Sequence, residues 1–142
     1  MKLVLRTFAS ALHLIPSPHF LSPLTRGLLC AAGGKTPWAG GTYTLKLTFT
    51  DDFPSQPPVV KFDPPLFHPN VYPCGKVCLS ILNMEGGWKA SITVLMILVG
   101  IQDLLQHPNL ADPAQRAAFV LARDDPAAYR TRVLEEAVKY AT

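Results

Sequence analysis

Alternating apolar and polar residues predict a β-strand at residues 42–50. The segment TYTLKLTFT has the two-residue period of a half-buried strand. Its apolar face consists of Tyr43, Leu45, Leu47 and Phe49. After the proline-rich segment FPSQPP, the short apolar run VVKF predicts a second strand that begins at Val59. Two strands with a short connection indicate an antiparallel meander.

The next segment, DPPLFHPNVYPCGKVCLSIL, contains four prolines and a glycine. Proline lacks a backbone N–H and fixes φ, so repeated prolines disfavour both helices and central strands. We therefore expect most of this segment to form a long, ordered loop.

Helical spacing of apolar residues begins after Trp88. Ser91 or Thr93 could cap a helix that ends at His107-Pro108. Its apolar positions are Ile97, Ile101, Leu104 and Leu105. We expect this to be the central, buried helix.

Two further helices are predicted from Asp-Pro pairs, in which the aspartate caps the helix and the proline takes its first position. Asp112-Pro113 opens PAQRAAFVLARD, and Asp125-Pro126 opens AAYRTRVLEEAVKYA. Strands come first and helices last, which predicts an α+β fold with an antiparallel β-meander packed on helices.

Composition excludes several classes of protein. The chain is 49% hydrophobic and 16% charged, too apolar for disorder and too charged for a membrane bundle. The net charge of +3 is too small to imply nucleic-acid binding. The longest apolar run, ITVLMILVGI at 92–101, is shorter than the roughly 18 residues of a membrane span. We expect neither nucleic acid nor membrane as a partner.

Cys78 is the candidate nucleophile, because a loop restrained by prolines can give a thiol access and a fixed position. Asn70, eight residues upstream, could donate to an oxyanion if the loop folds back. The odd number of cysteines favours a reducing compartment. Three alternatives remain: an inert buried cysteine, a disulfide with Cys74, or a metal site with Cys74 and His68, for which a fourth ligand is lacking.

The segment PPLFHPNVYPCGKVCLSIL resembles the active-site segment of ubiquitin-conjugating enzymes, in which an HPN triplet precedes the catalytic cysteine by this interval. Within that family it is most similar to the SUMO-conjugating enzymes. They share PLFHPNVYP, VCLSIL, GKTPWAGGTY, DDFPSQPP, GIQDLL and DPAQ, and a Cys78-to-Trp88 interval two residues longer than in typical ubiquitin carriers. The resemblance covers about residues 28–142 and implies the ubiquitin-conjugating fold.

The resemblance implies that Cys78 accepts SUMO as a thioester from the SUMO-activating enzyme and passes it to lysines of protein substrates. Asn70 would stabilise the oxyanion or order the loop, while Tyr72 and Asp112 would line the slot for the incoming lysine. SUMO ligases are further implied partners. No cofactor and no metal are implied, and the family's location is the nucleus and cytoplasm.

Substrate contacts are implied for Lys61, Cys74, Lys76, Pro113 and Ala114. SUMO carriers bind an acidic residue just after the target lysine, and they have Lys, Ser and Thr where this chain has Val59, Cys74 and Lys76. We expect Lys76, assisted by Lys61, to take over the acidic contact.

Residues 1–27 depart most from the family, whose members begin with a basic amphipathic helix. We expect that helix to be missing, with an atypical, weakly structured segment at 1–27 before a ubiquitin-conjugating core domain at 28–142. A secretory signal or a mitochondrial transit peptide are alternatives for this segment. Without the helix, stability and loading should be reduced, which leaves two further hypotheses: a catalytically weak interaction protein of the SUMO pathway, and a carrier of ubiquitin or another modifier.

Overall fold

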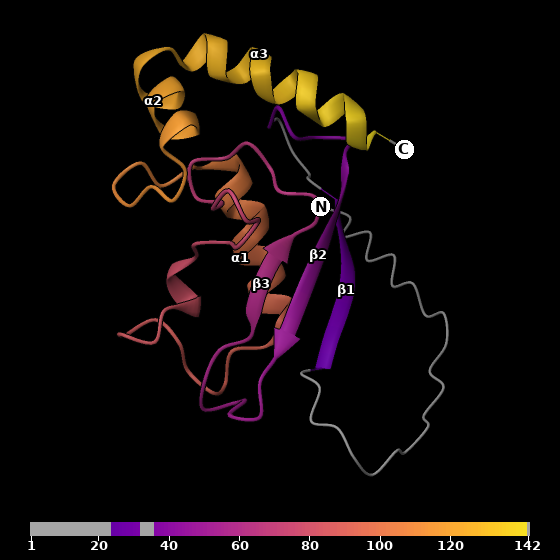
Figure 1. The fold of residues 1–142 in the computed structure, drawn as a ribbon, viewed down its shortest axis with the longest axis vertical. Coiled ribbons are helices and arrows are strands. Elements are labelled where there is room, and N and C mark those ends of the chain that lie inside the picture. Colours follow the sequence, from indigo (N-terminus) through magenta and orange to yellow (C-terminus); the bar gives the residue numbers. More distant parts are fainter. Residues whose placement is uncertain (1–23, 32–35, 142) are drawn as a thin grey trace.

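The computed structural model describes residues 24–31 and 36–141, and within them it contains an antiparallel three-stranded sheet of order β1-β2-β3 (Figure 1). The strands are β1 (Leu24–Ala31), β2 (Thr42–Phe49) and β3 (Val59–Phe62). The predicted meander is therefore confirmed, and β3 begins at the predicted residue. The alternation in β2 is confirmed too: Tyr43, Leu45 and Leu47 are fully buried, and Phe49 is half-buried at the end of the strand.

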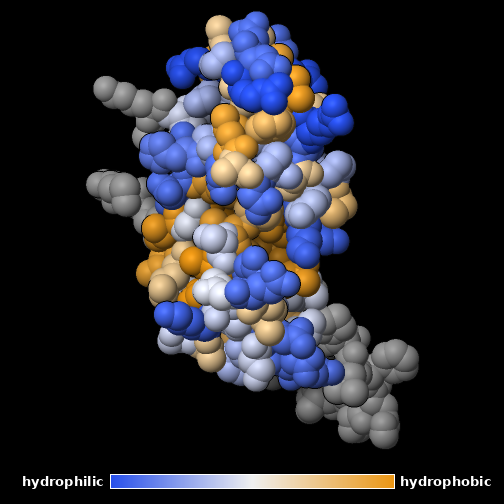
Figure 2. Space-filling view, turned by 90° about the vertical axis from the view of Figure 1, so that its left-hand side faces the viewer, coloured by the Kyte–Doolittle hydropathy of each residue, from blue (hydrophilic) through white to orange (hydrophobic). Residues whose placement is uncertain are grey.

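Helix α1 (Val94–Gln106) packs against the sheet, and its buried side chains belong to the same hydrophobic core as the inward side chains of β2 and β3. Thr93, rather than Ser91, is the N-cap, since its side chain accepts a hydrogen bond from the Met96 backbone N–H. The helix is not buried on all sides: Leu95, Met96 and Val99 are exposed. Figure 2 shows apolar side chains across the middle of one face of the molecule, between more hydrophilic ends.

Helices α2 (Arg116–Asp124) and α3 (Pro126–Ala137) follow, and Asp125 caps α3 as predicted by accepting a hydrogen bond from the Ala128 N–H. The predicted helix start at Pro113 is wrong. The backbone N–H groups of Ala114 and Gln115 both donate to the carbonyl oxygen of Pro69. This distant partner keeps residues 112–115 out of the helix and ties them to the loop before Asn70.

Residues 70–78 form a hairpin that extends the sheet beyond β3. Val71 pairs with Val77 inside the hairpin, and Lys76 pairs with Lys61 of β3. The predicted long loop is therefore ordered by strand-like pairing, which gives residues 76–78 an extended path. A short 3-10 helix, η1 (Ser80–Leu82), follows.

The expectations for the N-terminal segment fall mostly on residues 1–23, which lie outside the described residues. Strand β1 crosses the predicted boundary between residues 27 and 28, and the division into two parts stays a prediction. Among the described residues, no helix has the length and apolar character needed to cross a membrane.

Candidate active site

The hairpin places Cys78 at the surface end of an ordered backbone segment. The Cys78 N–H donates to the carbonyl oxygen of Asn70 at 2.8 Å, and the neighbouring Val77 N–H donates to that of Val60 at 2.9 Å. Val77 is buried whereas Cys78 is half-exposed. Hydrogen bonds to Asn70 on one side and to β3 on the other therefore hold the backbone at residues 77 and 78, while the sulfur of Cys78 stays accessible.

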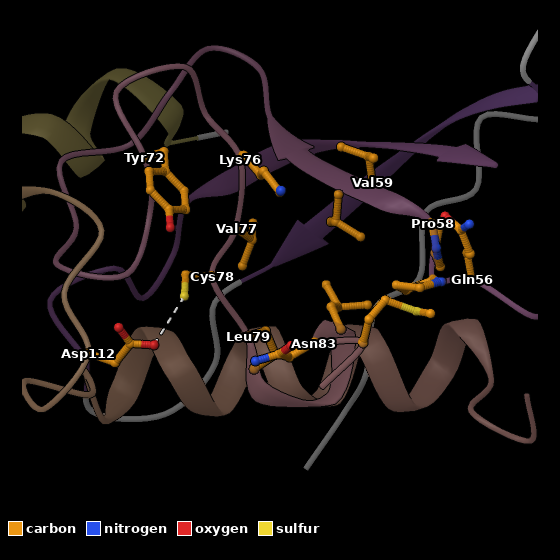
Figure 3. Close-up of a pocket in the computed structure, with 14 residues that line it drawn as sticks. Gln56, Pro58, Val59, Tyr72, Lys76, Val77, Cys78, Leu79, Asn83 and Asp112 are labelled. Atoms are coloured by element: carbon orange, nitrogen blue, oxygen red, sulfur yellow. Dashed lines mark hydrogen bonds between the residues drawn. The ribbon is translucent and has the colours of Figure 1, made fainter. Parts of the chain in front are cut away.

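Asp112 is the carboxylate nearest to this thiol in Figure 3, with Oδ2 at 3.8 Å from Cys78 Sγ. Burial raises the pKa of the Cys78 thiol, and the charge and hydrogen bond of Asp112 raise it further, while the ammonium of Lys76 lowers it. The resting form is the neutral thiol, hydrogen-bonded to the carboxylate.

Asn70 is 1% exposed, and all of its side-chain hydrogen-bonding atoms have backbone partners. Nδ2 donates to the carbonyl oxygens of Asn109 and Asp112, and Oδ1 accepts from the Asn109 N–H. In this structure the amide therefore orders the loop that carries Asp112. Donation to an oxyanion, which would require Nδ2 to release one of these carbonyls, stays a prediction.

His68 is fully buried under this loop and holds the backbone of Asn70 by a hydrogen bond. Its Nδ1 accepts a hydrogen bond from the Asn70 N–H at 3.0 Å, so the proton is on Nε2, which donates to the carbonyl oxygen of Leu104 at 3.1 Å. Burial lowers the pKa of His68 to about 4, against the smaller opposing effect of the Leu104 carbonyl. The imidazole is neutral at physiological pH and holds the loop on α1.

Two grooves meet at the thiol. The first, of about 460 Å³, lies between the hairpin, β3 and η1, and Tyr72 and Lys76 line it. The second, of about 530 Å³, lies toward α1 and the 83–87 loop. Cys78 and Asp112 line both grooves. Two ligands can therefore approach the same sulfur from different sides.

The predicted substrate contacts are not all brought together. Lys76 lines the first groove, whereas Lys61, Cys74, Pro113 and Ala114 line neither groove. Cys74 is exposed at the tip of the hairpin. The roles assigned to these residues stay predictions.

A row of exposed lysines runs beside the first groove. Lys46 of β2 pairs in register with Lys61 of β3, and Lys61 pairs with Lys76 of the hairpin. Lys46 forms an ion pair with Asp63. Among the described residues, Lys61 and Lys76 have no such carboxylate partner, so two positive charges face the solvent next to the groove.

Sequence reasoning missed Asn109 and the far end of the first groove. Asn109 contributes only backbone atoms to Asn70, so its residue type carried no signal. Leu82 and Met84 line the groove together with Val59, and the replacement of the family's lysine by Val59 was the available sign. The chain offers no group of three or more His, Cys, Asp or Glu side chains suited to a metal ion within residues 24–31 and 36–141.

Comparisons with known proteins identify the family to which the chain belongs. A family model for "Ubiquitin-conjugating enzyme" matches residues 26–137. The chain is 55% identical over 114 residues to SUMO-conjugating enzyme UBC9 of Caenorhabditis elegans, covering 79% of this chain and 69% of that protein. It is 52% identical to SUMO-conjugating enzyme SCE1 of Arabidopsis thaliana and 47% identical to Sumo-conjugating enzyme ubc9 of Dictyostelium discoideum, each over 113 residues, 78% of this chain and 71% of the relative. These matches confirm the resemblance and the fold class inferred from the sequence, and the chain belongs to the ubiquitin-conjugating enzyme family.

Proposed function

We propose that the chain is a SUMO-conjugating enzyme that carries SUMO on Cys78. The observation that carries the proposal is an accessible thiol 3.8 Å from the Asp112 carboxylate, at the point where two grooves converge. Transfer through a thioester needs this arrangement, because the sulfur must hold the modifier while the acceptor lysine reaches the adjacent thioester carbonyl carbon. The named relatives supply the modifier.

Loading is an exchange between thioesters. The Cys78 thiolate attacks the carbonyl carbon of the SUMO C-terminus on the activating enzyme, and the sulfur of that enzyme leaves as a thiolate. Because burial and Asp112 raise the pKa of the Cys78 thiol, the thiolate is the minor form before loading, and it forms when the thiol releases its proton to solvent. Lys76 favours the thiolate, since its positive charge lowers the same pKa.

Transfer to the acceptor is an aminolysis. The neutral lysine amine attacks the thioester carbonyl carbon, the C–N bond forms, the C–S bond breaks, and Cys78 leaves as a thiolate. The proton of the attacking amine goes to water. The Asp112 carboxylate would accept a hydrogen bond from the amine and stabilise the positive charge that develops on its nitrogen during attack. Tyr72, 41% exposed on the opposite wall, would restrict the lysine chain to the slot.

Acceptor choice is proposed to depend on charge as well. Lys76 lines the first groove and Lys61 lies beside it in register, so an acidic residue near the acceptor lysine would lie against two ammonium groups. SUMO ligases as partners, and a location in the nucleus and cytoplasm, also stay predictions.

The decisive experiment is a thioester assay with SUMO, its activating enzyme and ATP, resolved on reducing and non-reducing gels. We expect an adduct that reductant removes and that Cys78→Ala abolishes. Cys74→Ala is the matched control, because Cys74 is the other thiol of the same hairpin and is exposed; it should load normally.

Parallel reactions separate the remaining hypotheses. An adduct with ubiquitin and its activating enzyme, but none with SUMO, would contradict the choice of modifier. No adduct with either, from a protein that unfolds cooperatively, would favour the interaction protein over the enzyme.

A further inference from the structure

The first groove changes character along its length. Asp112 lies beside Cys78 at one end, and Lys76 lies between Tyr72 and Val59 (Figure 3). These are the two charged side chains among the described residues that line it. Beyond them, the lining is mainly apolar on both walls, with Pro58 and Val59 on the side of β3 and Leu82 and Met84 on the side of η1. The amide side chains of Gln56 and Asn83 also line this end.

Strand pairing places Val59 on the same face of the sheet as the thiol. The hydrogen bond from Val77 to Val60 joins the hairpin to β3, and Val59 and Cys78 are each one residue beyond it. Burial alternates on both strands, with Val60 and Val77 turned into the core. Val59 and Cys78 therefore share the outer face, and an acceptor that lies in the first groove passes close to Val59.

We propose that this apolar end binds an apolar side chain of the acceptor protein, two residues from the modified lysine. This inference rests on the proposed function and adds a substrate preference to it. In an extended peptide, residues two positions apart project from the same face, roughly 6.6 Å from each other. A lysine at Cys78 therefore brings its second neighbour over the wall formed by Val59, Leu82 and Met84.

The composition of the wall favours an aliphatic occupant over an acidic one. A carboxylate placed on the far side of Val59, against Leu82 and Met84, would lose water and would have only the amides of Gln56 and Asn83 as polar partners. Lys76, the one cation among the described residues that line the groove, lies on the other side of Val59. Met84 is 55% exposed, and an unbranched thioether side chain can adapt to occupants of different shape. The groove thus separates the acidic contact at Lys76 from the apolar contact at Val59.

Discharge of the SUMO thioester of the full chain to single-lysine peptides tests this preference. The peptides carry Leu, Ser or Glu two residues before or two residues after the lysine. We expect Leu to lower the half-saturating peptide concentration about fivefold relative to Ser at one of the two positions, because an open groove covers part of a leucine side chain. Equal values for Leu and Ser at both positions would overturn the proposal.

Charged variants locate the contact. Val59→Lys and Met84→Lys should remove the advantage of Leu, and Val59→Lys should raise the affinity for Glu. Thr50→Lys is the matched control, because it adds the same charge at an exposed residue outside the groove and should keep the preference. An unchanged advantage of Leu in Val59→Lys would contradict the assigned site.

A readout that needs no SUMO keeps this inference separate from the proposed function. In the unloaded chain, the Leu peptide should shift the methyl NMR signals of Val59 and Met84, while the Ser peptide should leave them in place. Failure of the thioester assay together with these shifts would refute the enzyme and retain the peptide-binding groove. Absence of the shifts would overturn the inference even in a chain that loads normally.

Discussion

Asn70 and Asn109 hold each other through a reciprocal pair of hydrogen bonds. Nδ2 of Asn70 donates to the carbonyl oxygen of Asn109, and the Asn109 N–H donates to Oδ1 of Asn70, both at 2.8 Å. Nδ2 also donates to the carbonyl oxygen of Asp112 at 3.1 Å. One buried side chain therefore fixes both ends of the segment that presents the carboxylate to Cys78.

Replacing Asn70 tests this role. Asn70→Ala leaves three backbone groups without their partner, so we expect a loss of about 3 kcal/mol in the free energy of unfolding and slower transfer to lysine. Denaturant unfolding and single-turnover discharge measure the two effects. Asn109→Ala keeps its backbone bonds to Asn70 and loses its side-chain bond to the Ala111 N–H, so it should cost less than about 1 kcal/mol. Slower transfer without any loss of stability would point instead to direct donation to the oxyanion.

The reactivity of Cys78 should respond in opposite directions to its two charged neighbours. Asp112 raises the pKa of the thiol beyond the effect of burial, and Lys76 lowers it. Asp112→Asn should therefore lower this pKa and speed alkylation near pH 8, whereas Lys76→Met should slow it. Mass spectrometry of the Cys78 peptide after iodoacetamide treatment at several pH values measures this rate separately from that of Cys74. Shifts in the same direction for both variants would contradict the electrostatic account.

Stability should fall in mild acid because of His68. Its pKa is lowered by burial to about 4 in the folded chain, from about 6.5 when unfolded, so the unfolded chain binds more protons below pH 6.5. This contribution is fully present above pH 6.5 and is lost as the pH falls toward 4. Linkage gives a loss of about 2 kcal/mol between pH 7.5 and pH 5, measurable by urea unfolding. In His68→Gln, which retains an N–H donor, most of that pH dependence should disappear.

The tight turn of the hairpin requires glycine at position 75. Gly75 has φ +87°, and an added Cβ would lie 2.3 Å from the carbonyl oxygen of Phe62. Gly40 has a similar φ of +83° and nothing within 4 Å of an added Cβ. We expect Gly40→Ala to cost about 1 kcal/mol and Gly75→Ala at least twice as much, roughly 2 kcal/mol or more, as measured by thermal unfolding. Equal losses would mean that the hairpin moves aside without strain.

Charge reversal at Lys76 tests the acidic contact. Lys76→Glu should slow modification of a peptide with an acidic residue after its lysine about tenfold, and that of a neutral peptide much less, because a repulsion replaces an attraction. The ratio of the two discharge rates is the measured quantity. Since Lys76 also affects the thiol pKa, both peptides share any change in chemistry, and equal losses would show that Lys76 does not contact the acidic residue.

Local sequence patterns predicted the structure correctly where the partner of a residue lies nearby in the sequence. The alternation from Tyr43 to Leu47 defined the inner face of β2, and Asp125 caps α3 through a residue three positions away. The start of α2 was mispredicted because Ala114 and Gln115 are bonded to Pro69, which lies far away in sequence. A prediction based on neighbouring residues cannot include a distant carbonyl oxygen that accepts these backbone hydrogen bonds.

The candidate site shows the same division. Family resemblance pointed to Cys78, Asp112 and Asn70, and the structure brings the three together although 34 residues separate the thiol from the carboxylate. The replacement of a family lysine by Val59 was visible in the sequence, but the apolar end of the first groove was not predicted, because Val59, Leu82 and Met84 come from separate segments. No single segment of the sequence indicates that these three side chains share a groove.

The pairing of the hairpin with β3 also has a consequence for solubility. An unpaired edge strand offers free N–H and C=O groups to other chains and promotes aggregation. Here Phe62 donates to Gly75 and Val77 donates to Val60, so the segment that ends in Cys78 also covers this edge of the sheet. Damage to the hairpin would therefore displace the thiol and also expose an unpaired strand edge. Such chains would aggregate rather than persist as folded, inactive protein.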